Sequence, residues 1–271
     1  MTIRFRNRMT LAFFIISVSC LMLGTFFTLF QFFSNSLVLP EVYTKGLSDN
    51  FLLSYSPIYT FIGIFILLIY VCVTSLIIYH SFEKTQAPDI VFFLIFLIAC
   101  LCDTSRVLVP IFQISGTFSL FLLKVGNIHL FARLLAPLAL MGNTVMSTED
   151  FRQNTDRNSI ILIIISLFFA EIIPLNTAVI LPNFCISYGY VKAIKGFSLL
   201  ICIVSTISLF YTNRRNEYKQ IMTVGFILIC IGYSLIFDSF NILTLSSGTI
   251  LLGIGTYLYL NEVHKHYLWI D

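Results

Sequence analysis

Residues 102–133 read CDTSRVLVPIFQISGTFSLFLLKVGNIHLFAR and carry five charged or titratable side chains in strongly apolar sequence: Asp103, Arg106, Lys124, His129 and Arg133. The polar segment QISGT at 113–117 separates two apolar runs, which predicts two membrane-spanning helices joined by a tight turn. Charges inside a bilayer are costly, so they normally face the interior of a helix bundle and pair with one another. This stretch therefore predicts a membrane-embedded protein with a polar cluster at its centre.

The composition of the whole chain supports this interpretation. Of its 271 residues, 58% are hydrophobic and only 11% are charged, whereas about a quarter of the residues in a soluble domain are charged. The net charge of +3 is small and forms no basic stripe, so the sequence indicates no nucleic-acid partner. The seven cysteines are odd in number and form no CxxC pair, which argues against a disulfide framework or a zinc site. We therefore predict an all-α integral membrane protein whose main partner is the lipid bilayer.

Eight apolar segments are long enough to cross about 30 Å of hydrocarbon as helices. We place them at 11–33, 57–79, 90–112, 118–142, 159–181, 191–212, 220–241 and 243–260. The first segment is interpreted as an uncleaved helix, because a signal peptide has a shorter apolar core and a small-residue cleavage site. The connections are short and polar, so we expect a single transmembrane domain over 1–271, a bundle of about eight helices with no soluble domain.

The distribution of lysine and arginine predicts the orientation of this bundle. With the N-terminus in the cytoplasm, ten basic residues fall on the inner side and three on the outer side, as the positive-inside rule requires. The outer three are Lys45, Lys192 and Lys195. Both termini are therefore predicted to be cytoplasmic. The short loops and the charge asymmetry indicate a multi-pass protein of a bacterial cytoplasmic membrane.

A similarity between the two halves of the chain suggests an internal duplication. Asp103-Thr-Ser-Arg106 resembles Asp238-Ser-Phe-Asn241, about half the chain further on. The hypothesis is that 1–142 and 159–262 are parallel four-helix repeats, related by an axis along the membrane normal. The alternative is chance similarity between apolar segments of low complexity.

Three acids and three bases lie within the predicted spans, a balance that pairing would produce. Asp103 and Arg106 share one helix face, while His129 and Arg133 lie on the face of their helix opposite to Lys124. The candidate binding residues are Asp103, Arg106, Lys124, His129, Arg133, Glu171, Asp238 and Asn241. They form either a polar cavity that opens to the outer side, or internal ion pairs that fix helix register, with Lys124 pairing to Glu171 or Asp238.

The sequence contains no motif of a known enzyme class. HExxH, GxSxG and Walker sequences are missing, so we expect no catalytic residues, no cofactor and no metal ligands. The first hypothesis is transport or binding of a small polar solute or ion. The alternative is a membrane sensor or scaffold without an output domain of its own, acting through other membrane proteins. One helix, a short outer segment and seven further helices is a layout that resembles the membrane region of some bacterial sensor proteins, and the resemblance extends to the layout alone.

Overall fold

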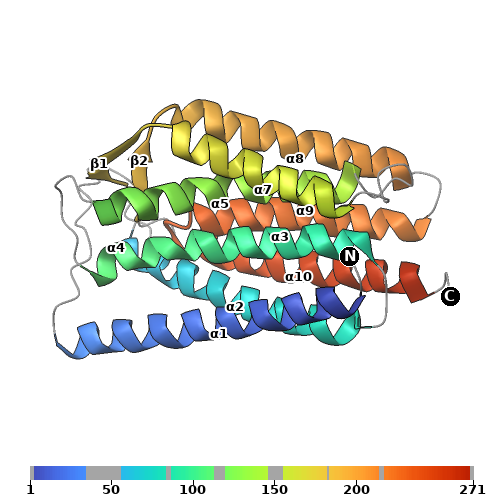
Figure 1. Cartoon of the computed structure of the whole chain (residues 1–271), viewed down its shortest axis with the longest axis horizontal. Helices are drawn as coiled ribbons and strands as arrows, with labels where there is room; N and C mark the ends of the chain where they lie inside the picture. Colours follow the sequence, from blue (N-terminus) through green and yellow to red (C-terminus); the bar gives the residue numbers. More distant parts are fainter. Residues whose placement is uncertain are drawn as a thin grey trace.

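The computed structural model describes residues 3–34, 56–83, 87–112, 120–145, 155–181, 183–213 and 217–268. The turn expected at 113–117 and nearly all of the segment between the first two helices lie outside these ranges. Helices in the described ranges lie side by side along a common axis (Figure 1). The long ones are α1 Ile3–Phe33, α2 Pro57–Ser81, α3 Pro88–Asp103, α5 Leu120–Val145, α7 Thr155–Ile172, α8 Val191–Asn213, α9 Glu217–Phe237 and α10 Ile242–Leu268.

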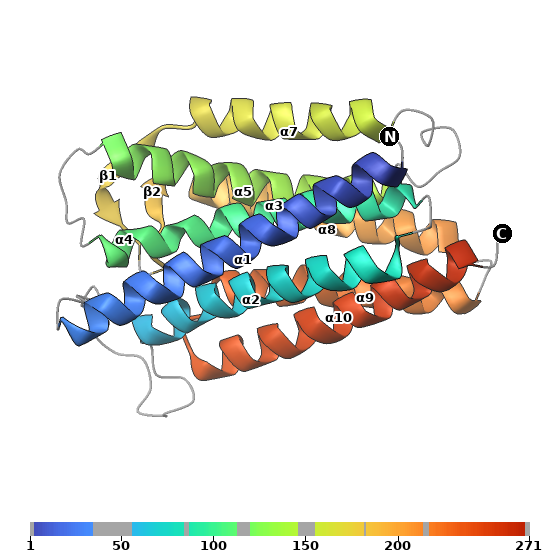
Figure 2. The ribbon, with the colours of Figure 1, turned by 60° about the horizontal axis from the view of Figure 1, so that its bottom comes forward.

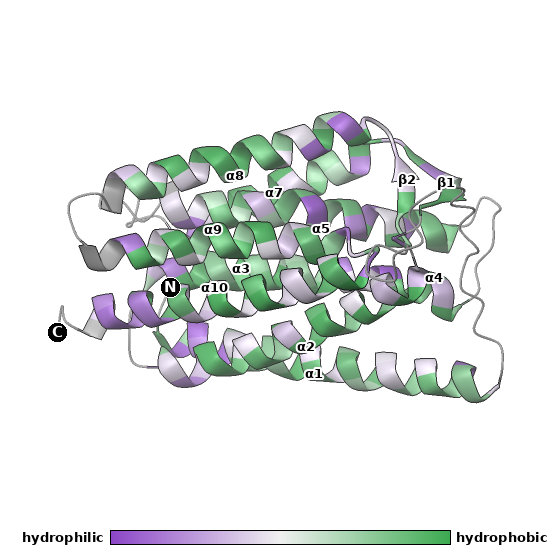
Figure 3. Ribbon diagram, turned by 180° about the vertical axis from the view of Figure 1, so that it is seen from behind, coloured by the Kyte–Doolittle hydropathy of each residue, from purple (hydrophilic) through white to green (hydrophobic). Residues whose placement is uncertain are grey.

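Seven helical segments in the described part of the chain are long and apolar enough to cross a membrane. Hydrophobic residues cover most of the length of the helices, and the hydrophilic ones gather nearer to the two ends of the bundle (Figure 3). The most exposed of these segments is α1, which lies outside α2 (Figure 2). Only 6% of the residues in its most apolar stretch are buried. Such a surface requires lipid as its solvent, and the chain is therefore a polytopic membrane protein.

The start of α1 and the end of α10 lie at one end of the bundle, which we call the terminal end (Figure 1). The opposite end carries a β-hairpin, and we call it the hairpin end. Chain ends on the same side agree with an even number of crossings. Which side of the membrane the terminal end faces stays a prediction, as do the duplication of 1–142 and 159–262 and the single domain over 1–271.

The fifth predicted span, 159–181, is wrong in its second half. Helix α7 ends at Ile172, and Leu175–Ile180 forms strand β1, which pairs antiparallel with β2, Ile186–Tyr188. Pro174 explains the change, because proline disfavours helical geometry at the residue before it. Helix α7 also carries three charged side chains, Asp156, Arg157 and Glu171, in 18 residues, and it is not one of the seven segments.

The third predicted span continues beyond α3 through a change of helix type. A 3₁₀ turn, Thr104–Val107, follows α3, and a short helix, α4, covers Leu108–Ile111. Pro110 has no N–H with which to bond the carbonyl of Arg106, four residues earlier, so a regular α-helix cannot be completed here. The tighter turn lies where Arg106 enters the interior of the bundle.

Close contact between α9 and α10 depends on glycine. A Cβ at Gly225 would lie 2.9 Å from the carbonyl oxygen of Gly255, and one at Gly232 would lie 2.5 Å from the amide nitrogen of Leu252. Small residues allow helix backbones to approach in this way, which is a common basis of helix association in membranes. These glycines recur at a spacing of seven residues, Gly225 with Gly232 and Gly248 with Gly255. This spacing is visible in the sequence and indicates a helix-packing face.

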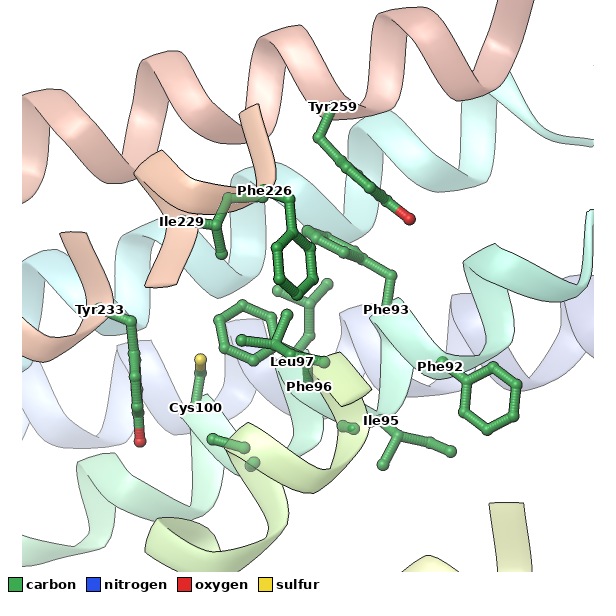
Figure 4. Close-up of a cluster of buried hydrophobic side chains, with 14 of the residues drawn as sticks. Phe92, Phe93, Ile95, Phe96, Leu97, Cys100, Phe226, Ile229, Tyr233 and Tyr259 are labelled. Atoms are coloured by element: carbon green, nitrogen blue, oxygen red, sulfur yellow. The ribbon is translucent and has the colours of Figure 1, made fainter. Parts of the chain in front are cut away.

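Phenylalanines fill the middle of the bundle (Figure 4). Phe93 stacks on Tyr259 with ring centroids 5.7 Å apart, and Phe96 meets Tyr233 edge-on at 5.6 Å. Phe226 is fully buried beside them. This apolar layer separates Tyr233, which lies nearer the hairpin end, from Tyr259, which lies nearer the terminal end.

Candidate functional site

Three of the predicted residues form a buried network near the hairpin end. Asp103 ends α3, Arg106 lies in the 3₁₀ turn and His129 lies on α5, and their exposed fractions are 0%, 0% and 1%. Asp103 Oδ2 is 3.2 Å from Arg106 Nη2, and Asp103 Oδ1 is 2.9 Å from His129 Nδ1. A buried ion pair is tolerated only when further polar contacts offset the loss of solvation.

Main-chain carbonyls supply these further contacts. Arg106 Nη1 donates to the carbonyl of Phe237 at 3.1 Å and approaches that of Asn183 at 3.5 Å. Phe237 is the last residue of α9, where helix carbonyls have no partner within the helix and carry a partial negative charge. Arg106 therefore connects the end of α9 and the β-hairpin to α3.

The β-hairpin covers this network at the hairpin end of the bundle. Phe184, in the turn, adopts a φ of 60°, which is uncommon for a side chain of this size, and it is fully buried against Phe61. Cys185 Sγ lies 3.9 Å from His129 Nδ1. Sequence reasoning missed Asn183, Phe184 and Cys185, although Pro174 and Gly189 bracket the hairpin and could have indicated it.

The other predicted residues lie apart from this network. Glu171 accepts a hydrogen bond from Asn127 at 3.0 Å on the surface, and Asp238 pairs with Lys195 at 3.1 Å. Lys124 is exposed and has no ion pair within the described residues, so the expected pairs of Lys124 with Glu171 or Asp238 do not form there. Those pairs were expected from charge balance alone, which does not determine which side chains meet.

Asp238 and Asn241 belong to a connection rather than to the span 220–241. Helix α9 ends at Phe237 and α10 begins at Ile242. The backbone N–H of Asn241 donates to Thr244 Oγ1 at 3.2 Å, and the Thr244 hydroxyl donates to the carbonyl of Asn241 at 2.9 Å. Asn241 thus lies at the start of α10, where its backbone bonds the Thr244 side chain, in contrast to the buried Arg106 with which the duplication would equate it.

Arg133, on α5, lies at the wall of a cavity of about 610 Å³ between α5, α8 and α9. Its guanidinium carbon is 3.6 Å from the centroid of the Phe237 ring, a cation–π contact. Arg133 Nε is buried and has no hydrogen-bond partner in the described chain. Phe237 also stacks on His129, with centroids 5.5 Å apart, so the buried network holds the ring that supports Arg133.

Five further polar side chains line the cavity, and the sequence did not single them out as binding residues. Two of them, Thr206 and Ser234, donate their hydroxyls to carbonyls of their own helices. Lys195 and Ser198 lie one turn apart on α8, and Tyr233 lies on α9. Ser198 Oγ and Tyr233 Oη are buried without a hydrogen-bond partner among the described residues. The remaining lining is largely apolar and includes Leu199, Ile203, Ile207, Ile227 and Ile231.

Tyr188, in β2, is a further titratable group in the field of Arg133. Burial raises the pKa of its phenol, and the positive charge of Arg133 only partly opposes this shift. Tyr188 is therefore neutral at physiological pH and does not neutralise Arg133.

No group of three or more histidine, cysteine or acidic residues suited to a metal occurs in the described ranges. No family model, curated protein or solved structure matches the chain.

Proposed function

We propose that this protein binds a small anionic solute within the membrane, for its transport or its detection, at the cavity between α5, α8 and α9. The observation that carries the proposal is the position of Arg133. Its guanidinium lies at the cavity wall against an aromatic ring, and no carboxylate of the described chain pairs with it.

The charges around the cavity support an anionic ligand. Asp103 is matched by Arg106, and Asp238 is matched by Lys195. Arg106 and Arg133 are two permanent cations and Asp103 is one carboxylate, so this region keeps at least one unmatched positive charge whatever the charge of His129. An unpaired charge is costly in a low-dielectric interior, and an anion that enters the cavity offsets this cost.

In this proposal Asp103, Arg106 and His129 are positioning residues. Arg106 bonds the carbonyl of Phe237 and His129 stacks on its ring, so both restrain the surface on which the Arg133 guanidinium lies. Binding geometry of this kind depends on side chains that hold the contacting group within a fraction of an ångström. The polar network near the hairpin end thus acts on the ligand through Phe237.

The phenylalanine layer favours binding over continuous conduction. Phe93, Phe96 and Phe226 fill the interior on the terminal side of Tyr233. A polar solute crossing there would lose its solvation without finding partners. Transport would therefore require α8 or α9 to move, and α8 is the less buried of the two.

The proposal can be tested by equilibrium binding of radiolabelled carboxylates of different chain lengths to the purified protein in nanodiscs. A charge-assisted hydrogen bond contributes about 1.5–3 kcal/mol, so Arg133→Gln should weaken binding about 10- to 150-fold. Arg133→Lys, which keeps the charge, should retain part of the affinity. Lys124→Gln is the matched control, because Lys124 is an exposed cation of the same helix outside the cavity lining.

Equal binding by the wild type, Arg133→Gln and Lys124→Gln would contradict the proposal. Failure of every carboxylate to bind the wild type would do the same. Either result would favour the alternative of a sensor or scaffold that acts through other membrane proteins.

A further inference from the structure

The cavity beside Arg133 has a polar end and a long apolar wall. Lys195 and Ser198 mark the polar end on α8, and the same helix lines the cavity as far as Ile207. Twelve residues separate Lys195 from Ile207, which is about 18 Å at the rise of an α-helix. Half of a bilayer's hydrocarbon core, the depth that one acyl chain occupies, is about 15 Å.

The apolar wall is open to the lipid. Leu199, Ile203 and Ile207 line the cavity and yet each has half or more of its surface exposed. Ile231 of α9, on the other side, is also exposed. A ligand can therefore enter sideways from the bilayer, between α8 and α9, without passing through the phenylalanine layer.

The head group must supply the selectivity of such a site. Lipid tails are as apolar as these side chains, so an acyl chain that leaves the bilayer for the cavity gains little from the hydrophobic effect. A carboxylate matches the planar guanidinium of arginine, and its negative charge offsets the excess positive charge beside the cavity. The volume of about 610 Å³ lies within the range of sites for one small molecule, which fits a single chain.

We infer that the ligand is a long-chain fatty acid, whose carboxylate meets Arg133 and whose tail lies against Leu199, Ile203 and Ile207 between α8 and α9. This inference rests on the proposed anion site and adds to it a binding surface for the acyl tail of the ligand. Ser198 and Tyr233 each contribute a buried hydroxyl to the lining near Arg133. The head group lies toward the hairpin end and the tail runs toward the terminal end.

The test compares palmitate, butyrate and hexadecanol for saturable binding to the full chain in nanodiscs of zwitterionic phospholipid. Palmitate carries both the carboxylate and the tail, butyrate lacks most of the tail, and hexadecanol lacks the charge. We expect palmitate to bind about tenfold or more tightly than either of the others, because butyrate does not concentrate in the bilayer beside the cavity and hexadecanol lacks the charge. Arg133→Gln should remove the preference of palmitate over hexadecanol.

Two tryptophan variants of α8 test the tail. Ile203→Trp fills the cavity and should weaken palmitate binding about tenfold or more. Leu200→Trp is the control, since Leu200 is 58% exposed against 50% for Ile203 but does not line the cavity. Thermal unfolding of both variants checks that each retains the fold.

The possible outcomes separate the tail from the anion site. If butyrate binds as well as palmitate and Ile203→Trp has no effect on palmitate binding, the proposed binding of an acyl tail in the cavity is contradicted, while the proposed anion site is retained. If neither carboxylate binds, or Arg133→Gln changes nothing, both proposals are overturned. If hexadecanol binds as tightly as palmitate, the cavity binds acyl chains without selectivity for a carboxylate head group, which also contradicts the inference.

Discussion

The carboxylate of Asp103 lies between a guanidinium and an imidazole that come from different parts of the chain. An unpaired charge at this depth would cost several kcal/mol. Arg106 reduces that cost further by bonding the end of α9. Both Arg106 and Arg133 contact the Phe237 ring, but only Arg106 forms an ion pair with a carboxylate. Arg133 is therefore the candidate ligand-binding arginine.

At the scale of single residues, Asp103→Asn should strongly destabilise the protein. The variant leaves the Arg106 guanidinium buried beside a neutral amide, and breaking a buried pair costs about 3–5 kcal/mol. Thermal unfolding in detergent, followed by the loss of monodisperse protein, measures the change. Glu171→Gln is the control, because Glu171 is exposed, and it should change stability little. Equal unfolding temperatures for the two variants would show that the network contributes no net stability.

Among the elements, the connection between α7 and α8 departs most from the expected arrangement. A span that continued to 181 would have left the network near the hairpin end uncovered. The chain instead leaves the helix at Pro174 and forms β1 and β2, and the hairpin turn brings Phe184 and the carbonyl of Asn183 to the network. The element that replaces half a helix thus supplies contacts to Arg106 and His129.

The α9–α10 contact leads to a prediction at the scale of elements: alanine substitutions at two nearby glycines should change the stability of the protein in opposite directions. A Cβ at Gly255 would lie 2.8 Å from the Gly225 carbonyl oxygen, whereas one at Gly253 meets nothing within 4 Å. Gly255→Ala should therefore destabilise the protein by about 1–3 kcal/mol through overpacking. Gly253→Ala should stabilise it by up to about 1 kcal/mol through helix propensity. Thermal unfolding of both variants provides the measurement, and equal shifts would contradict this close packing.

At the scale of the whole molecule, the bundle is closed along its axis and open at its side. The phenylalanine layer blocks the interior, and the cavity of about 610 Å³ lies between α8 and two neighbouring helices. The surrounding lipid therefore has direct access to the candidate site. This geometry suits a ligand that partitions into the bilayer.

The shared position of the two chain ends leads to a topology prediction. Both lie at the terminal end, and the positive-inside rule assigns that end to the cytoplasm. A fluorescent protein that matures only in the cytoplasm should therefore fluoresce when fused to either terminus. Alkaline phosphatase, which is active only outside, should be inactive at both positions. Phosphatase activity at one terminus alone would contradict the even number of crossings.

The sequence by itself determined that this chain is a helical membrane protein with charges inside its spans. Hydropathy and helix length are local properties, so they can be predicted from consecutive residues. The Asp103–Arg106 pair was predictable for the same reason, since three residues of helix separate the two side chains. The spacing of the glycines on α9 and α10 is also visible in the sequence, but the sequence does not show that these two helices pack against each other.

Only the tertiary structure decided which charges meet and which face the cavity. Lys124 and Arg133 are both cations on α5, yet one is exposed and the other lies against Phe237, a residue more than 100 positions later. The pairing of Asp238 with Lys195, and the hairpin over His129, likewise depend on contacts between distant segments. Such contacts are determined by the packing of all helices together, and no stretch of sequence contains them.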